Sequence, residues 1–327
     1  MITIPPVSTQ RGRRTWAAVV LALFSPALGM MYLGRGWRAL GYFVATFVLL
    51  AVTIALAAHG YWKEGVGVAV PTQILFFTGI VDCYRIARSL SEQFSGPWYS
   101  RGYAIAASAA AIVAFVLCLR GFVVEPYRIP SGAMIPTLRI GDLILVNKWQ
   151  YGIRMPFAYT MLIERGSPRR GDIIVFRYPF EPSQYYVKRI VGLPGDRVQY
   201  INGALIINGV PVERQPKEDF FDHSRVQRYL QFQEHLGDHS YPVIYSDGVS
   251  TPVRPAPRHT DRQACIYADG GVSCTVSPQS YFVIGDNRDN SEDSRYWGFV
   301  PSGNIAGRVF LVWWSERSPE RAWREIQ

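Results

Sequence analysis

The stretch Gly285-Asp-Asn-Arg-Asp-Asn-Ser-Glu-Asp-Ser-Arg-Tyr-Trp-Gly-Phe-Val300 lies between two runs that predict β-strands, residues 280–284 and 307–313. Both runs are rich in β-branched and aromatic residues, which favour strands. The dipeptides Asn202-Gly203 and Asn208-Gly209 are typical of tight turns, and the first lies in a predicted hairpin. Further strands are predicted at residues 142–147, 172–177 and 185–191. This part of the chain therefore predicts a mainly-β domain.

The predicted β domain covers residues 123–327, and we expect a polar insert at about residues 211–278 to form a subsidiary β lobe. Residues 1–122 form a separate region with four apolar stretches, at residues 16–33, 40–58, 66–81 and 103–119. Because a spanning helix needs about 20 apolar residues, the second and fourth stretches predict membrane spans. Pro71 shortens the third. Pro26 and Gly29 interrupt the first, which could be a span, a re-entrant hairpin or an interfacial helix.

The loops between these stretches predict the orientation of the chain. Basic residues mark the cytoplasmic side of a membrane, and they occur before the second stretch and between the third and fourth, as Arg35, Arg38, Arg85, Arg88 and Arg101. The β domain is therefore expected on the far side. Four full spans would place the basic residues at 11–14 outside, whereas three spans and a non-crossing first segment would place them inside. The first stretch lacks a small-x-small cleavage site, so we expect it to be retained.

The charge of the chain is concentrated in the apolar region. The formal net charge is +9, and residues 1–122 hold ten Lys and Arg against three Asp and Glu. A nucleic-acid-binding protein would instead carry a basic patch on a soluble face. We therefore expect no nucleic-acid partner.

The cysteines fall into two classes. Cys83 and Cys118 lie within or beside apolar stretches, where a thiol acts as a small hydrophobic group. Cys265 and Cys274 lie in the exported part, where disulfides persist, and we predict that they are bonded. The alternative is a pair of free thiols.

The histidines do not indicate a catalytic triad or a metal site. His59 lies near an apolar stretch, and the other four lie in the polar insert, away from Ser131, so a Ser-His-Asp triad is unsupported. His235 and His239 are four residues apart, but Gly237 between them weakens the helix that a zinc pair would need. We expect no metal and no cofactor. The insert histidines are His223, His235, His239 and His259.

A lysine can replace histidine as a general base if it is kept neutral. Burial in an apolar pocket can lower a lysine pKa from about 10.4 to about 7 to 8. Lys188 lies on a predicted strand among apolar and aromatic residues. The alternative is that its side chain points to solvent, as most charged residues on strands do.

Four segments resemble, in order, the sequence boxes of bacterial type I signal peptidases. They are residues 129–138 with Gly141-Asp142, residues 170–176, residues 188–196 and residues 285–300. The resemblance covers most of the chain except residues 1–100 and the insert. It implies a signal-peptidase-like β fold and a membrane-bound Ser-Lys endopeptidase that removes signal peptides after small-x-small sites. The multi-span N-terminal region departs from the one or two spans usual in the family.

The resemblance also implies roles for single residues. In the family, the first box runs Pro-Ser-x-Ser-Met-x-Pro-Thr-Leu and its second serine is the nucleophile, but Ala133 occupies that position here. Lys188 matches the general base, and Ser291 matches the residue that orients it. The hydroxyl of Ser131 and the backbone N–H of residue 133 would form the oxyanion hole. A supporting ion pair is implied at Asp293 and Arg295.

By the same resemblance, shallow apolar pockets would select small side chains before the cut. An extended peptide could add alongside the strands that carry them. The implied partners are signal peptides of exported preproteins, the lipid bilayer and the protein-export translocon, at a bacterial inner membrane with the β domain in the periplasm. Trp313 and Trp314 could seat this domain on the bilayer, although one of them could equally be core. The pocket residues are Tyr127, Ile129, Pro130, Met134, Leu138, Tyr186 and Val187.

Ala133 leaves two interpretations open. A methyl group cannot form an acyl-enzyme, and Ser131 matches an oxyanion donor rather than a nucleophile. The chain is therefore either an inactive form of a working peptidase or a pseudopeptidase that binds signal peptides without cutting them. The presence of Lys188 and Ser291 favours the first. A third interpretation, a membrane scaffold or transporter with an ancillary β domain, leaves the four boxes unexplained.

Overall fold

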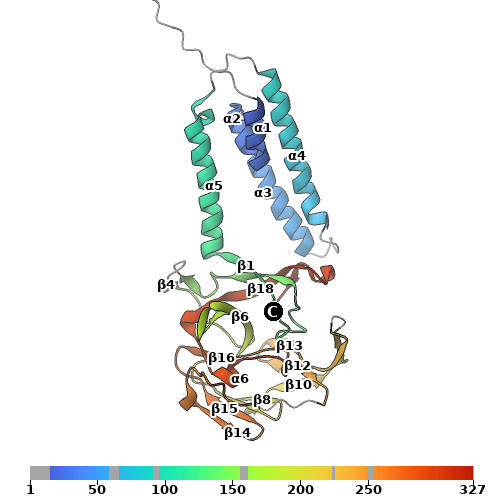
Figure 1. The fold of residues 1–327 in the computed structure, drawn as a ribbon, viewed down its shortest axis with the longest axis vertical. Coiled ribbons are helices and arrows are strands. Elements are labelled where there is room, and N and C mark those ends of the chain that lie inside the picture. Colours follow the sequence, from blue (N-terminus) through green and yellow to red (C-terminus); the bar gives the residue numbers. More distant parts are fainter. Residues whose placement is uncertain are drawn as a thin grey trace, which may run out of the picture. The chain divides into compact units, whose positions relative to one another are not determined.

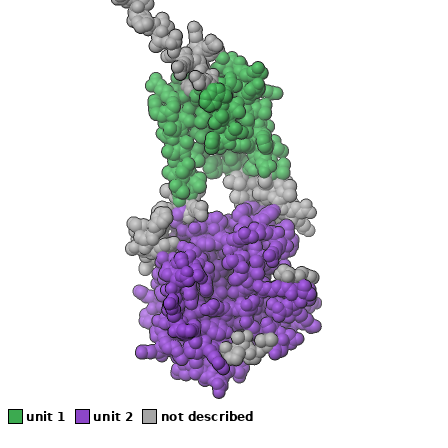
Figure 2. Space-filling view, viewed as in Figure 1, with its two compact units in different colours: residues 1–118 green, residues 119–327 purple. Residues whose placement is uncertain are grey.

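The computed structural model describes residues 15–58, 66–90, 96–154, 161–222, 225–248 and 253–326. The chain divides into two compact units, residues 1–118 and residues 119–327 (Figure 2). The first is helical and the second is mainly β (Figure 1). The basic residues at 11–14, together with His59 and His223, lie outside the described residues.

The helices of the first unit follow the predicted apolar stretches. The first stretch forms two short helices, α1 (Thr15–Phe24) and α2 (Pro26–Tyr32). Proline has no backbone N–H to continue a helix but is well suited to begin one, so Pro26 separates the two. The other stretches become α3 (Gly36–Ala58), α4 (Val66–Ser89) and α5 (Gly102–Phe122), and α4 continues through Pro71.

Small side chains allow the first helices to pack closely. Ala18, Ala22, Met30 and Cys83 are fully buried together. At Gly29, a Cβ would lie 2.8 Å from the Cys83 sulfur, so α2 and α4 could not approach as closely with a larger residue. Cys83 is therefore a buried hydrophobic group, as predicted, whereas the side chain of Cys118 lies outside the described part. Within the described residues, no helix combines the length and the apolar character needed to cross a bilayer.

An antiparallel eight-stranded sheet forms the centre of the β unit. Its order is β1-β2-β18-β5-β6-β16-β17, and β19 pairs with β18. The five predicted strands are confirmed as β2, β5, β6, β16 and β18. Strand bounds are β1 (Val124–Arg128), β2 (Asp142–Asn147), β5 (Ile173–Tyr178), β6 (Glu181–Gly192), β16 (Ser280–Ile284), β17 (Val300–Pro301), β18 (Ile305–Ser315) and β19 (Arg324–Glu325).

Both faces of this sheet are covered. Ile173 and Val175 of β5 pack into one apolar cluster with Leu138, whereas Ile174 and Phe176 pack into another. Successive side chains of a strand point to opposite faces, so an unbroken apolar run on β5 serves two cores. This explains why the predicted strands lack a simple alternation of polar and apolar residues.

A second, five-stranded sheet has the order β14-β15-β7-β8-β9. Asn202 and Gly203, with φ of 49° and 79°, form the predicted turn between β7 and β8, because this hairpin turn requires positive φ at both central residues. The strands are β7 (Arg197–Ile201), β8 (Ala204–Ile207), β9 (Val210–Pro211), β14 (Cys265–Ala268) and β15 (Gly271–Thr275).

A third sheet, here called the subsidiary sheet, contains β10 (Glu213–Pro216), β11 (Phe220–Asp222), β12 (Gln227–Leu236) and β13 (His239–Ser246). The insert at residues 211–278 thus contributes to two sheets, because β14 pairs with β15 and β15 pairs with β7 rather than with β13. The unit also contains a short hairpin, β3 (Gly152–Arg154) with β4 (Met161–Glu164), and the one-turn helix α6 (Ser294–Trp297). Short 3₁₀ helices at Arg262–Ala264, Ser302–Asn304 and Pro319–Arg321 complete its described elements.

The predicted disulfide joins Cys265 of β14 to Cys274 of β15, which are cross-strand partners. Replacing both cysteines with alanine should lower the free energy of unfolding by about 3 kcal/mol. The reason is that the disulfide closes the loop between residues 265 and 274 and so restricts the unfolded chain. Denaturant unfolding of the full chain in detergent measures the effect. A reductant should destabilise the original chain and leave the double variant unchanged. Equal stability of the two oxidised proteins would contradict the prediction.

Candidate active site

The segment with Ala133 connects β1 to β2 and is held by its own apolar side chains. Met134 and Leu138 are buried in the same cluster as Ile129. The Ile129 N–H donates to the Asp142 carbonyl at 2.9 Å, which closes the base of the loop. Ala133 is 7% exposed, whereas the Ser131 side chain is exposed. The apolar anchors thus place Ser131 at the surface of the β unit, with Gly132 and Ala133 buried just beneath it.

Lys188 does not point to solvent. It lies on β6 opposite Ile174 of β5 and is 5% exposed. Burial lowers the pKa of the Lys188 ammonium to about 8, against the opposing effect of the Asp293 carboxylate and with a smaller contribution from Arg295. A lysine with a pKa near neutrality can serve as a general base.

Gly285 is the point at which the predicted residues come together. Strand β16 pairs with β6 so that Val283 faces Ile190 and Ile284 faces Arg189. The next step in this register places Gly285 beside Lys188, and cross-strand neighbours point to the same face of a sheet. A Cβ at Gly285 would collide with the Ser291 hydroxyl and would lie 2.6 Å from the Ala133 carbonyl oxygen. Ala133 and Ser291 therefore lie on the sheet face to which Lys188 points.

Ser291 differs in one respect from its predicted role. Its hydroxyl is buried and has no hydrogen-bond partner among the described residues, so the expected bond to Lys188 is not formed. The side chain instead packs against the main chain of Gly285.

Asp293 and Arg295 form the predicted ion pair, and both are almost completely buried. Asp293 is also the N-cap of α6 and accepts the Gly285 N–H at 3.0 Å, so it ties the helix to the end of β16. Burial alone would raise the pKa of Asp293, but Arg295 and the Gly285 N–H together hold that pKa below its usual value. Arg295 also donates to the Arg288 carbonyl at 2.7 Å. The pair therefore fixes the loop around Ser291.

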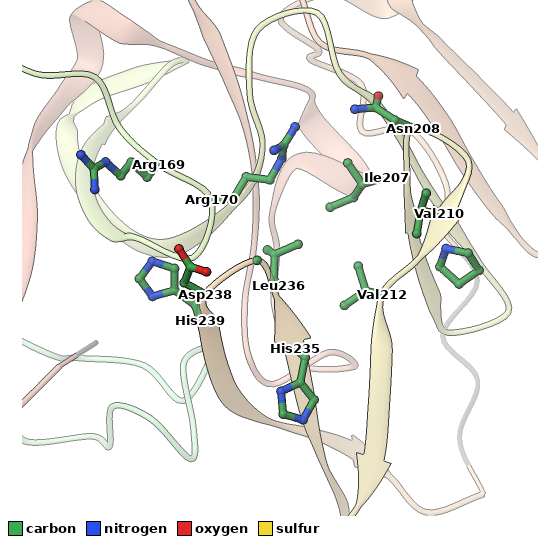
Figure 3. Close-up of a pocket in the computed structure, with 12 residues that line it drawn as sticks. Arg169, Arg170, Ile207, Asn208, Val210, Val212, His235, Leu236, Asp238 and His239 are labelled. Atoms are coloured by element: carbon green, nitrogen blue, oxygen red, sulfur yellow. The ribbon is translucent and has the colours of Figure 1, made fainter.

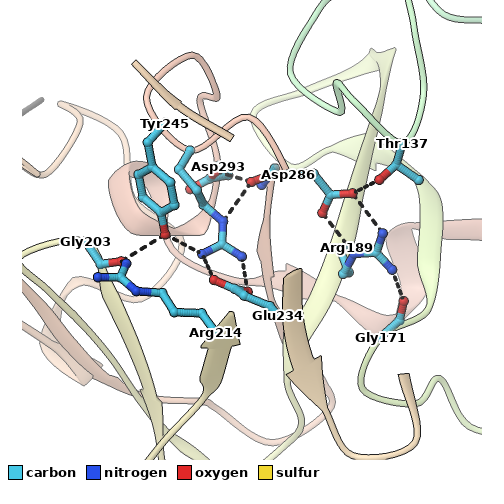
Figure 4. Close-up of polar contacts among 11 residues, drawn as sticks. Thr137, Gly171, Arg189, Gly203, Arg214, Glu234, Tyr245, Asp286 and Asp293 are labelled. Carbon is cyan, nitrogen blue, oxygen red and sulfur yellow. Dashed lines mark hydrogen bonds and ion pairs between the residues drawn. The ribbon is translucent and has the colours of Figure 1, made fainter. Parts of the chain in front are cut away.

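A second buried ion pair joins two sequence boxes. Arg189 donates to both carboxylate oxygens of Asp286, at 2.9 and 2.8 Å, and Thr137 donates to the same carboxylate at 2.5 Å (Figure 4). The Asn287 N–H donates to the Ala133 carbonyl at 3.0 Å. These bonds hold the loop after β16 against the segment that carries Ala133.

The subsidiary sheet supports the same loop, which the sequence did not predict. Arg288 donates to Glu234 of β12 at 2.6 and 2.5 Å, and the two side chains are 1% and 2% exposed (Figure 4). The Ile244 N–H of β13 donates to the Asp286 carbonyl at 3.0 Å, and Tyr241 stacks on the Arg189 guanidinium at 3.9 Å. No motif in the insert marks Glu234, because its partner lies more than fifty residues away in sequence.

The residues predicted to line the substrate pockets fall into two groups. Ile129, Met134 and Leu138 are almost completely buried and can only support a pocket from beneath. The others reach the surface to some degree: Pro130 is exposed, and Tyr127, Tyr186 and Val187 are half-buried.

The insert histidines lie elsewhere. His235 and His239 both line a cavity of about 520 Å³ beside Arg169 and Arg170 (Figure 3). Arg170 is held there by a bidentate ion pair with Asp196. His259 is close to the Tyr267 hydroxyl, at 3.0 Å. Among the described residues, no group of three or more His, Cys, Asp or Glu side chains is arranged to hold a metal ion.

Comparison with known proteins identifies the family. Residues 103–314 match the family model described as signal peptidase, peptidase S26. Signal peptidase I of Pseudomonas aeruginosa is 43% identical over an alignment of 226 residues that covers 64% of this chain and 71% of the relative. Signal peptidase I of Aquifex aeolicus is 34% identical over 223 residues, covering 64% and 82% of the two chains. A crystal structure of a signal peptidase I from Enterococcus faecalis is 29% identical and covers 44% of this chain and 97% of its own, with a TM-score of 0.26. With its matching model and its relatives, this chain belongs to the peptidase S26 family of signal peptidases.

Proposed function

We propose that this chain is a signal peptidase I built for Ser-Lys chemistry on exported preproteins, and that it lacks only the nucleophile. The observation that carries the proposal is the position of Lys188. This lysine is buried, its pKa is lowered to about 8, and it points to the sheet face that holds Ala133 and Ser291. Burying a lysine is costly, and Lys188 has no ion pair among the described residues, so a functional role is the reason we favour for its position.

The chemistry follows from these positions if residue 133 is a serine. Neutral Lys188 would take the hydroxyl proton as the serine oxygen attacks the carbonyl carbon at the cut, and an ester to the enzyme would form. The backbone N–H of residue 133 and the Ser131 hydroxyl would donate to the oxygen that becomes negative. The lysine would return its proton to the departing amine, and water would then hydrolyse the ester. With alanine at 133, the first bond cannot form.

The substrate proposed is an extended signal peptide with small side chains before the cut. Half-buried Tyr127 and Val187, which pack with Met134, offer an apolar surface beside the Ala133 segment, together with exposed Pro130. Half-buried Tyr186 lies on the other face of β6, where its ring is next to the Lys188 amine. Tyr127 of β1 and Tyr185 of β6 lie 5.3 Å apart between ring centroids, so these two strands border the same surface. A peptide pairing with strand backbone there would gain main-chain hydrogen bonds.

We further propose that α3, α4 and α5 lie in a bacterial inner membrane, with the β unit in the periplasm near the export translocon. Large apolar side chains on these helices are exposed, and a bilayer would cover them. Arg85 and Arg88 near the end of α4, and Arg35 before α3, would mark the cytoplasmic side. Half-buried Trp313 and Trp314 could contact lipid headgroups. Exposed apolar residues include Trp37 (88%), Phe77 (63%) and Leu117 (62%).

The experiment that tests this proposal is the single change Ala133→Ser. In detergent micelles, the variant should convert a preprotein to its mature form, whereas the original chain should leave it intact. Mass spectrometry of the product should place the cut after a small-x-small site. A variant that leaves every preprotein uncut would contradict the Ser-Lys assignment.

The second candidate is a receptor that binds signal peptides without cutting them, and Ala133 itself favours it. The Ala133→Ser experiment also distinguishes the two candidate functions. A receptor would bind the peptide with either residue at 133 and would gain no cleavage from the serine.

A further inference from the structure

An arginine from the subsidiary sheet lies against the segment that carries Ala133. Arg225 is in the turn between β11 and β12, and a Cβ at Gly132 would lie 2.6 Å from its Nη1, 2.7 Å from its Nη2 and 3.0 Å from its Cζ. The guanidinium therefore covers the backbone of Gly132, between Ser131 and Ala133. No sequence box contains Arg225.

This guanidinium has no carboxylate partner in the part of the chain that the structure describes. Among the described residues, no ion pair includes Arg225, and its side chain is exposed. Arg228, three residues later and already in β12, is instead paired with Asp219. Of these two arginines, Arg228 is neutralised by an ion pair, whereas Arg225 offers an exposed positive charge to a ligand.

The position of Arg225 indicates which part of a substrate it would meet. The segment at residues 129–138 contacts two separate apolar clusters. Ile129, Met134 and Leu138 pack with Tyr127 and Val187, the surface proposed for residues before the cut. Ile135 packs with residues of the subsidiary sheet, Tyr229 and Ile244 among them. An extended peptide that lies over the first side must continue past position 133 toward the second, where Arg225 lies.

We propose that Arg225 binds an acidic side chain at the start of the mature protein, immediately after the cut, and so contributes to substrate choice. This inference rests on the proposed function, since it uses the peptide path of a signal peptidase. A guanidinium offers planar, bidentate donors that match a carboxylate. Preproteins whose mature part begins with Asp or Glu would bind more tightly than those that begin with Lys.

The test uses the full chain with Ala133, which should hold peptides without cutting them. Three fluorescent peptides span one signal-peptide cut and differ only at the first residue after it, which is Asp, Asn or Lys. We expect the Asp peptide to bind about fivefold more tightly than the Lys peptide, the size of effect that a partly exposed ion pair gives. Arg225→Gln should remove the preference, Arg225→Glu should reverse it, and added salt should weaken it. The matched control, Arg228→Gln, should keep it.

Different results of the binding test would contradict the role of Arg225 and the proposed peptidase function. Binding without an acid preference, or a preference unchanged by Arg225→Gln, would overturn the role of Arg225 alone. Peptide binding could show an acid preference that depends on Arg225 while the Ala133→Ser variant cuts no preprotein. That result would support the role of Arg225 and contradict the proposed cleavage activity. Failure of all three peptides to bind would overturn both.

Discussion

In a chain that carries Ala133→Ser, replacing Lys188 with methionine should lower the rate of preprotein cleavage by about 10³-fold or more. A positioned general base contributes about 10²- to 10⁴-fold, and the loss of a member of a nucleophile–base unit often costs still more. Methionine fills a similar volume without the amine, so β6 should keep its packing. Initial rates of cleavage in detergent measure the effect. As a control, Lys217→Met changes an exposed lysine directly after β10 and should leave the rate unchanged.

The same variant should show a pH dependence set by Lys188. The base acts only when it is neutral, and burial lowers the pKa of Lys188 to about 8. The value of kcat/KM should therefore rise with pH, about tenfold per pH unit below about pH 8, and should level off above it. A rate independent of pH between about 6 and 9 would show that Lys188 is not the base.

Glu234→Gln should lower the free energy of unfolding by about 3 kcal/mol or more. Glu234 and Arg288 are 2% and 1% exposed, so the change leaves a buried guanidinium without its counter-charge. Breaking a buried ion pair from one side costs about 3 to 5 kcal/mol. Because Arg288 belongs to the loop that also holds Ser291, cleavage by the Ala133→Ser chain should fall as well. Denaturant unfolding of the full chain in detergent measures the stability.

The control for this prediction is the pair of Arg228 and Asp219, whose side chains are 70% and 24% exposed. Asp219→Asn should cost less than about 1 kcal/mol, because surface ion pairs contribute little. The double variant Glu234→Gln/Arg288→Gln should recover part of the loss, because removing both charges also removes the cost of burying them. Equal effects of Glu234→Gln and Asp219→Asn would contradict the role of the buried pair.

Local sequence patterns were sufficient for five strands of the central sheet and for the turn at Asn202-Gly203. The limits of β2 and β16 matched the predicted strands, because apolar β-branched runs between turn residues leave little choice of conformation. The pairing of the insert strands was not predictable in the same way. Strands β14 and β15 join β7 across a large separation in sequence, and nothing in their own residues specifies that partner.

The sequence by itself determined the family boxes, the absence of a hydroxyl at Ala133 and the presence of a lysine that could be a base. Only the tertiary structure decided that Lys188 is buried and that Ser291 and Ala133 lie on its side of the sheet around Gly285. It also revealed Glu234 behind Arg288 and Arg225 over Gly132, neither of which belongs to a box. The physical reason is that a residue's type fixes which proton or charge it can carry, whereas its pKa and its partners depend on burial and on neighbours that only folding brings together.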